Sequence, residues 1–159
     1  MDERIKSIIH KAVDDAGRYP FLFIGSGLSR RYCGTPGWEG LLSDICAEVL
    51  DDPYAFARFK SQAKIAVQNG KVESELPYVA TLMESEVNHE LFASDEFAAF
   101  REDHSDELTG DASPMKIYVA DKIARARLVE SAETEKLAKA GREKVAGIIT
   151  TNYDCMCET

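Results

Sequence analysis

The sequence predicts an α/β protein whose chain supplies the first part of a Rossmann-like parallel sheet. Two short apolar segments, near residues 20–25 and 144–151, have the composition of buried strands. Helical periodicity dominates the rest of the chain. A glycine-rich turn directly follows the first segment, and polar residues follow the second. Since ligands bind outside the carboxyl ends of parallel strands, we expect the functional site there.

The N-terminal region predicts a helix followed by the first strand. Residues 2–17 form the helix, with Gly17 as its C-terminal stop. Its apolar residues recur at helical spacing: Ile5, Ile8, Ile9, Ala12, Val13 and Ala16. Pro20–Ile24 is an unbroken apolar run bounded by Pro and Gly, which is typical of a strand buried on both faces.

The residues between the strands predict a large helical insertion, over about 38–141. A simple crossover between parallel strands needs only about a dozen or more residues, so this stretch forms a subdomain or insertion. Gly141 is expected to end its last helix, and 104–113 is expected to be a loop. The expected helices cover 38–50, 54–69, 75–87, 89–101, 115–129 and 132–140.

The second strand, near 144–151, is β-branched and is followed by Asn152-Tyr153-Asp154. A sheet of only two strands is rarely stable by itself, because independent stability usually requires three or more strands. The sequence therefore predicts that the domain continues beyond residue 159, so that the C-terminal remainder is missing here; the alternative is that a partner chain completes the sheet.

Charge and composition exclude several classes of protein. The chain has 159 residues with 19 Lys and Arg against 28 Asp and Glu, a net charge of -9. It shows no clustered basic residues, so we expect no direct nucleic-acid binding. No apolar run could span a bilayer and no signal-peptide core is visible, so a cytoplasmic protein without a membrane partner is predicted. Cys33, Cys46, Cys155 and Cys157 lack the paired spacing of a zinc site, and we expect no metal.

The turn Gly25-Ser26-Gly27-Leu28-Ser29 predicts a phosphate-binding loop. Glycines after a strand let backbone N–H groups approach an anion. Arg30 stands where the usual dinucleotide fingerprint has its third glycine, and no Lys-Ser/Thr of a P-loop follows. The alternative is a turn that needs glycine only for its conformation. Arg30 and Arg31 could pair with pyrophosphate or form a solvated basic pair.

Asn152 and Asp154 are the second candidate group. The Asn amide can both donate and accept, which suits a carboxamide, a ribose hydroxyl or a positioned water. The Asp carboxylate can bind ribose hydroxyls or stabilise a developing cation. The alternative for Asp154 is an Asx cap at the start of another helix.

Taken together, these motifs resemble the sirtuin-like domain. The chain has Gly-Ser-Gly-Leu-Ser at 25–29, Thr-Pro-Gly-Trp-x-x-Leu-Leu at 35–42 and Ile-Thr-Thr-Asn-Tyr-Asp at 149–154. The last two forms are similar to the branch found in bacterial anti-phage defence proteins. The resemblance covers about residues 20–42 and 144–158.

The resemblance implies a Rossmann-like fold that binds NAD and hydrolyses it to nicotinamide and ADP-ribose as an anti-phage effector. It also implies a homo-oligomer or a defence-system partner protein. Transferred residue by residue, the NAD-binding positions are Gly25, Ser26, Gly27, Ser29, Asn152 and Asp154. Asn152 would be catalytic, positioning the water or the ribose at the reacting carbon, and Asp154 would help to hold the nicotinamide side.

One departure from the family pattern is the histidine. The family uses a His after the Asn motif, whereas His10, His89 and His104 all precede Asn152. The sequence therefore predicts that this His lies beyond residue 159. It also leaves open a non-catalytic NAD- or ADP-ribose-binding sensor or assembly module. A Rossmann oxidoreductase or methyltransferase is a third alternative, which Arg30 disfavours for the oxidoreductase.

Overall fold

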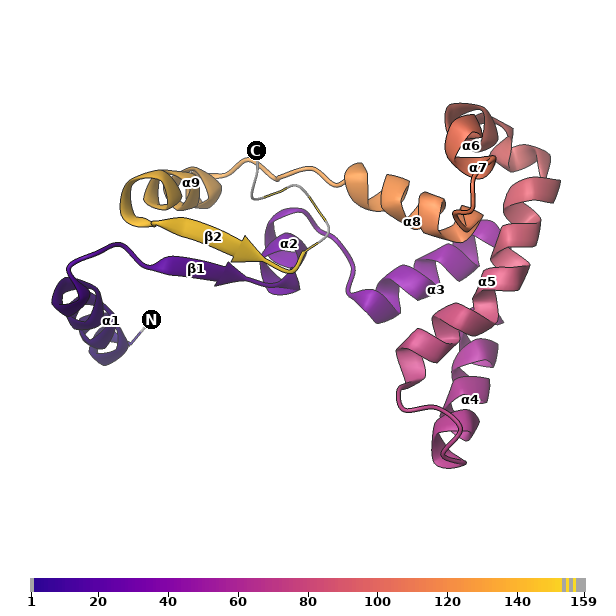
Figure 1. Ribbon diagram of the computed structural model, residues 1–159, viewed down its shortest axis with the longest axis horizontal. Coiled ribbons are helices and arrows are strands. Elements are labelled where there is room, and N and C mark those ends of the chain that lie inside the picture. The colour runs from indigo at the N-terminus through magenta and orange to yellow at the C-terminus, as the bar shows by residue number, and fades with distance from the viewer. Residues whose placement is uncertain (1, 153, 155, 157–159) are drawn as a thin grey trace. The chain divides into compact units, whose positions relative to one another are not determined.

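The computed structural model describes residues 2–152, 154 and 156 (Figure 1). The chain divides into two compact units. We call Met1–Thr35 with Ala126–Thr159 the sheet unit, and Pro36–Arg125 the helical unit. Each is described by itself.

The sheet unit contains a two-stranded parallel sheet, which is consistent with the predicted α/β class. In the register of the pair, Phe21 lies opposite Gly147 and Ile24 opposite Thr150. The elements of this unit are α1 (Glu3–Ala16), β1 (Phe21–Ile24), α2 (Ser26–Tyr32), α9 (Ala132–Lys144) and β2 (Gly147–Thr150).

Helix α1 has the predicted bounds and recognisable caps at both ends. The Asp2 side chain accepts a hydrogen bond from the Arg4 amide at 2.9 Å, satisfying one of the free N–H groups of the first turn. Gly17 has a φ of 61°, the left-handed conformation that ends many helices.

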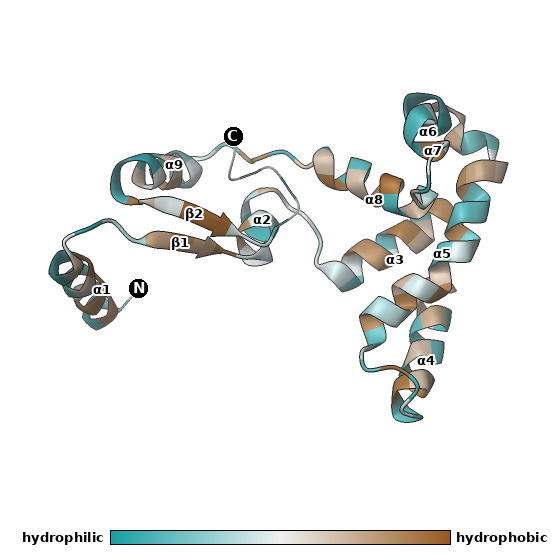
Figure 2. Cartoon of the chain, viewed as in Figure 1, coloured by the Kyte–Doolittle hydropathy of each residue, from teal (hydrophilic) through white to brown (hydrophobic). Residues whose placement is uncertain are grey.

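The prediction that both strands are buried on both faces is wrong for the described residues. Phe23 is 72% exposed and Ile149, its partner in the register, is 51% exposed. Figure 2 shows that β1 and β2 are largely hydrophobic all the same. Apolar composition therefore identified the strands correctly, but no described element covers this face of the sheet.

Helix α9 is longer than predicted. It runs through Gly141 to Lys144, so Gly141 does not end it. A glycine inside a helix costs about 1 kcal/mol relative to alanine, which neighbouring residues with good propensity can offset. At its start, Ser131 and Thr134 form a reciprocal capping box. Since α9 reaches Lys144, β2 begins at Gly147 and is shorter than the predicted strand.

The helical unit is built around one apolar core. Its elements are α3 (Trp38–Val49), α4 (Ala55–Gln68), α5 (Glu75–Ala93), η1 (Asp95–Phe97), α6 (Ala98–Asp103), α7 (Ser105–Leu108) and α8 (Pro114–Ala124). Ile45, Phe59 and Met83 are almost completely buried where α3, α4 and α5 pack together. Burial of side chains of this size stabilises a fold by about 1.5–3 kcal/mol each.

The two helices predicted at 75–87 and 89–101 are instead one helix, α5, followed by η1 and α6. The boundary was expected at Asn88, whose side chain has another role. Its Oδ1 accepts hydrogen bonds from the Met115 amide at 2.8 Å and the Ser113 hydroxyl at 3.2 Å, so it caps α8. The expected loop at 104–113 includes the short helix α7, and α8 ends at Ala124, before the predicted residue 129.

Candidate functional site

The parallel pairing brings the two predicted motifs to the same edge of the sheet. Ile24, the last residue of β1, lies opposite Thr150, the last residue of β2. Beyond the sheet, the Thr151 amide donates to the Ile24 carbonyl at 3.3 Å. The glycine turn and Asn152 therefore both follow the carboxyl ends of the strands, as predicted.

Ser29 and Asn152 form a direct hydrogen bond. The Asn152 Nδ2 group donates to the Ser29 hydroxyl oxygen at 2.7 Å. Ser29 lies in α2 and is 2% exposed, which makes it one of two buried polar residues among those described. This contact links two motifs that lie 123 residues apart in the sequence.

The other polar atom of the same amide has no partner. Asn152 Oδ1 is buried and accepts no hydrogen bond from the described part of the chain. An unsatisfied buried acceptor costs about 1–3 kcal/mol. A hydroxyl or amide N–H group of a ligand could satisfy it, because both are donors.

The glycine turn is exposed to solvent. Gly25 is the N-cap of α2 without a side-chain cap, and Gly25, Ser26 and Gly27 are all exposed. The first N–H groups of a helix have no acceptor within the helix. A Cβ atom on Gly25 or Gly27 would meet nothing within 4 Å. Since neither glycine has a positive φ, the alternative that the turn needs glycine for its conformation gains no support.

Asp154 makes a local contact. Its Oδ1 accepts a hydrogen bond from the Met156 amide at 3.2 Å, the contact of an Asx turn. The side chain is half-buried. Tyr153, between Asn152 and Asp154, lies outside the described residues.

Arg31 pairs with Glu133, a contact that the sequence did not predict. Its Nη2 donates to both carboxylate oxygens, at 2.8 and 3.1 Å, and so connects α2 to the start of α9. The hydrogen bond from Arg31 holds the pKa of Glu133 below its usual value. Arg31 is therefore paired with a carboxylate although its side chain is 65% exposed, and Arg30 is exposed as well.

The histidines lie apart from these motifs in the chain. His10 is exposed on α1, and His89 is exposed on α5 of the helical unit. His104, in the same unit, packs against the Phe100 ring with centroids 4.9 Å apart. The positions that carry the predicted site therefore contain no imidazole.

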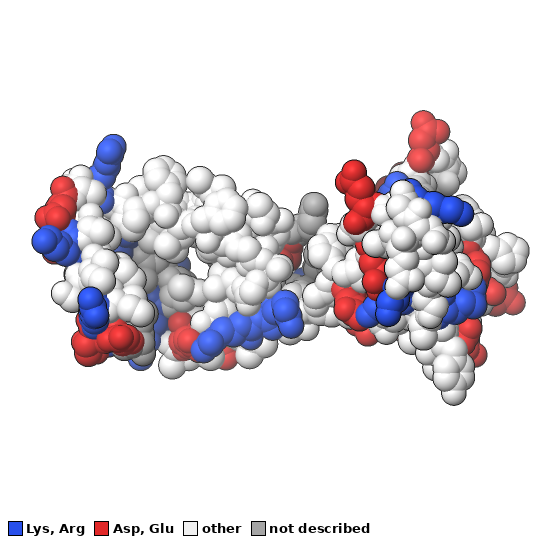
Figure 3. All heavy atoms as spheres, turned by 90° about the horizontal axis from the view of Figure 1, so that it is seen from below, with Lys and Arg blue, Asp and Glu red and all other residues white. Residues whose placement is uncertain are grey.

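The described residues include no group of three or more His, Cys, Asp or Glu side chains that could hold a metal ion. Cys46 is a buried free thiol, and Cys155 and Cys157 lie outside the described residues. None of the described helices is both long and apolar enough to cross a membrane. On the face shown in Figure 3, basic and acidic side chains are interspersed.

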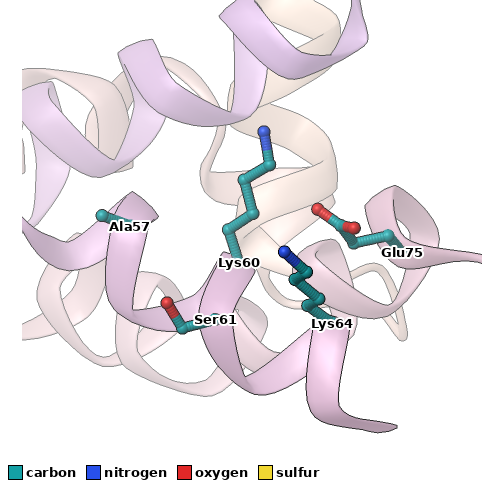
Figure 4. Close-up of a pocket in the computed structure, with 5 residues that line it drawn as sticks. All are labelled: Ala57, Lys60, Ser61, Lys64 and Glu75. Atoms are coloured by element: carbon teal, nitrogen blue, oxygen red, sulfur yellow. The ribbon is translucent and has the colours of Figure 1, made fainter. Parts of the chain in front are cut away.

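A pocket of about 350 Å³ lies in the helical unit (Figure 4). Lys60, Ser61 and Lys64 line it from α4, and Glu75 from the start of α5. The Lys60 ammonium group already donates to Glu39 of α3. None of the predicted site residues lines this pocket, so it offers no support for the NAD site.

Comparison with known proteins identifies no relative. No protein-family model, curated protein sequence or solved structure matches the chain.

Proposed function

We propose that this protein binds NAD at the carboxyl ends of β1 and β2 and hydrolyses it to nicotinamide and ADP-ribose. The observation that carries the proposal is the Ser29–Asn152 hydrogen bond, which leaves a buried amide oxygen without a donor. The same hydrogen bond links Asn152 to α2, whose N-terminal turn Gly25-Ser26-Gly27 is exposed. An unpaired acceptor and the N-terminal turn of a helix suit a ligand that has both hydroxyl and phosphate groups.

Each site residue has a defined role in this proposal. The first-turn amides of α2, with Gly25, Ser26 and Gly27, would bind the phosphates. Ser29 would fix the Asn152 amide through its hydrogen bond. Asn152 Oδ1 would then accept from a ribose hydroxyl or the attacking water. Cleavage of the nicotinamide–ribose bond passes through an oxocarbenium-like state, as in glycoside hydrolysis.

Asp154 would contribute on the nicotinamide side through its carboxylate. Its Oδ1 is engaged by the Met156 amide, so Oδ2 is the atom assigned to the ligand. A carboxylate near the reacting carbon stabilises the positive charge that develops as the bond breaks.

The proposal also covers the fold of the whole domain and its role in the cell. The domain would be Rossmann-like with a helical insertion. The protein would act in the cytoplasm as an anti-phage effector, controlled by a homo-oligomer or a defence-system partner. The sequence motifs at 25–29 and 149–154 support it. An enzyme that depletes NAD must be held inactive until it is triggered, which is the reason to expect such control.

The test is NAD turnover by the purified protein and by the full-length gene product, followed as nicotinamide release. If the purified protein or the full-length product hydrolyses NAD, Asn152→Ala should abolish that turnover. Asn69→Ala, an exposed residue at the end of α4, is the matched control and should retain it. Turnover that survives Asn152→Ala would contradict the proposed role of this residue.

A second candidate function is a non-catalytic NAD- or ADP-ribose-binding module. The observation behind it is that neither motif, at 25–29 or at 149–154, contains a His. Calorimetric titration with NAD and ADP-ribose distinguishes the two functions. Saturable binding without nicotinamide release would support the module, and release would support the hydrolase.

A further inference from the structure

Asn152 is held at its backbone as well as at its side chain. Its backbone N–H donates to the Thr150 hydroxyl oxygen at 3.0 Å, and its Nδ2 group donates to the Ser29 hydroxyl oxygen at 2.7 Å. The first contact comes from the end of β2 and the second from α2. A side chain is oriented more closely when separate hydrogen bonds fix its backbone and its polar end. The direction of the unpaired Asn152 Oδ1 therefore depends on two hydroxyl groups.

Thr150 is the residue at which β2 ends. It is still paired with Ile24 in the register of the sheet, whereas Asn152 lies beyond the strand. A Thr hydroxyl that accepts from the amide two residues ahead takes the place of the backbone acceptor of a turn. The Thr150 hydroxyl therefore helps to set the direction in which the chain leaves the sheet towards Ser29.

The neighbouring Thr151 differs from Thr150 in this contact. Its side chain is exposed, and its hydroxyl makes no hydrogen bond to any described residue. Only its backbone amide is engaged, by the Ile24 carbonyl at 3.3 Å. Thr and Val are both β-branched and both favour strands, so Val at either position keeps the shape and the strand preference. The same substitution at the two positions therefore isolates the hydroxyl that contacts Asn152.

We propose that Thr150 is a positioning residue for Asn152. This inference rests on the proposed NAD site. The Thr150 hydroxyl holds the backbone of Asn152 while Ser29 holds its amide, so that Oδ1 faces the ligand before the ligand arrives. Without the Thr150 hydroxyl, binding must also pay for ordering Asn152, and the affinity falls.

Calorimetric titration with ADP-ribose, which has no nicotinamide bond to hydrolyse, measures this effect. Thr150→Val should raise the dissociation constant by about tenfold, the loss expected for a hydrogen bond of ordinary strength. Thr150→Ser keeps the hydroxyl and should restore the wild-type value, although Ser favours strands less than Val does. Thr151→Val is the matched control and should also bind as the wild type does.

Nuclear magnetic resonance of the ligand-free protein gives a readout that does not depend on NAD. In Thr150→Val, the backbone amide of Asn152 should exchange with solvent about tenfold faster, because its acceptor is gone. The side-chain amide signals of Asn152 should shift as the contact with Ser29 loosens. Thr150→Ser and Thr151→Val should leave both signals as in the wild type.

The two readouts separate the role of Thr150 from the NAD site. If the wild type binds no ADP-ribose, the proposed NAD site fails, and the Asn152 signals alone decide whether Thr150 positions this residue. If the wild type binds and Thr150→Val binds equally well, the NAD site stands and the role of Thr150 is overturned. Equal losses in Thr150→Val and Thr151→Val, or no rescue by Thr150→Ser, would also overturn it.

Discussion

At the scale of single residues, the Asn152 amide depends on Ser29. The 2.7 Å hydrogen bond from Nδ2 orients the amide so that Oδ1 is the atom left for a ligand. Ser29 is 2% exposed, so water cannot easily replace its hydroxyl. In the proposed NAD site, Ser29 would therefore act through Asn152 as a positioning residue, in addition to its expected place in the phosphate-binding turn.

We expect Ser29→Ala to lower the free energy of unfolding of the sheet unit by about 1–3 kcal/mol, because it leaves a buried donor unpaired. Chemical denaturation of Ser29→Ala, Asn152→Ala and the double variant measures the coupling between the two side chains. The two single effects should not add, with a coupling of at least about 0.5 kcal/mol. Ser61→Ala, at an exposed position of α4, is the control. Additive effects would show that the hydrogen bond contributes nothing.

Cys46 gives a pH-dependent prediction at the same scale. The thiol is 1% exposed, and burial raises its pKa from 9.0 to about 11. The unfolded chain therefore loses this proton at a lower pH than the folded protein does. The contribution of the thiol to stability is complete below pH 9 and is lost as the pH rises towards 11.

We accordingly expect the free energy of unfolding of the helical unit to fall between pH 9 and pH 11. Iodoacetamide labelling followed by peptide mass spectrometry provides a second measurement. Cys46 in the folded protein should react much more slowly at pH 9 than Cys46 in the urea-unfolded protein, because the thiolate is the reactive form and burial raises the pKa of the thiol. Equal labelling of Cys46 in the two states would contradict the assigned burial.

At the scale of elements, Asn88 connects two helices. It lies within α5, and its Oδ1 satisfies the Met115 amide in the first turn of α8. We expect Asn88→Ala to cost about 1 kcal/mol of stability, the usual effect of losing a helix cap. Urea unfolding measures this, with Asn69→Ala as the exposed control. An equal loss of unfolding free energy in both variants would contradict the assignment of Asn88 as a helix cap.

The elements differ in how far the sequence could predict them. Strand positions and parallel pairing followed from apolar runs and their polar ends, and α1 followed from its periodicity and Gly17. Helix ends at Asn88 and Gly141 were wrongly predicted, because a residue type that often ends helices also occurs inside them. Burial of the strands was wrongly predicted because it depends on which elements cover the sheet.

The candidate site was predictable as a set of positions but not as contacts. Ser29 and Asn152 were each identified by their place after a strand. Their hydrogen bond depends on the register of β1 and β2, which composition does not specify. The Arg31–Glu133 pair was missed because its partners lie 102 residues apart and neither belongs to a recognisable motif.

At the scale of the whole molecule, the apolar core and the candidate site belong to different units. All residues of the described hydrophobic core lie in the helical unit, between Leu41 and Met115. The buried residues described in the sheet unit are the polar Ser29 and Thr134. Hydrophobic burial is the dominant favourable term in folding, so the helical unit has most of the driving force for folding in this chain.

We therefore expect the fragment 36–125 to fold by itself. It should show helical circular dichroism and one cooperative unfolding transition, because it retains every residue of the core. Within the intact chain, amide exchange should be slower in α4 and α5 than in β1 and β2, since exchange follows local opening and exposed elements open more easily. Phe59→Ala should lower the stability of the fragment by about 3–5 kcal/mol, whereas Phe92→Ala, 52% exposed, should cost far less. An unfolded fragment, or faster exchange in α4 and α5 than in the strands, would show that the helical unit depends on the sheet unit for its fold.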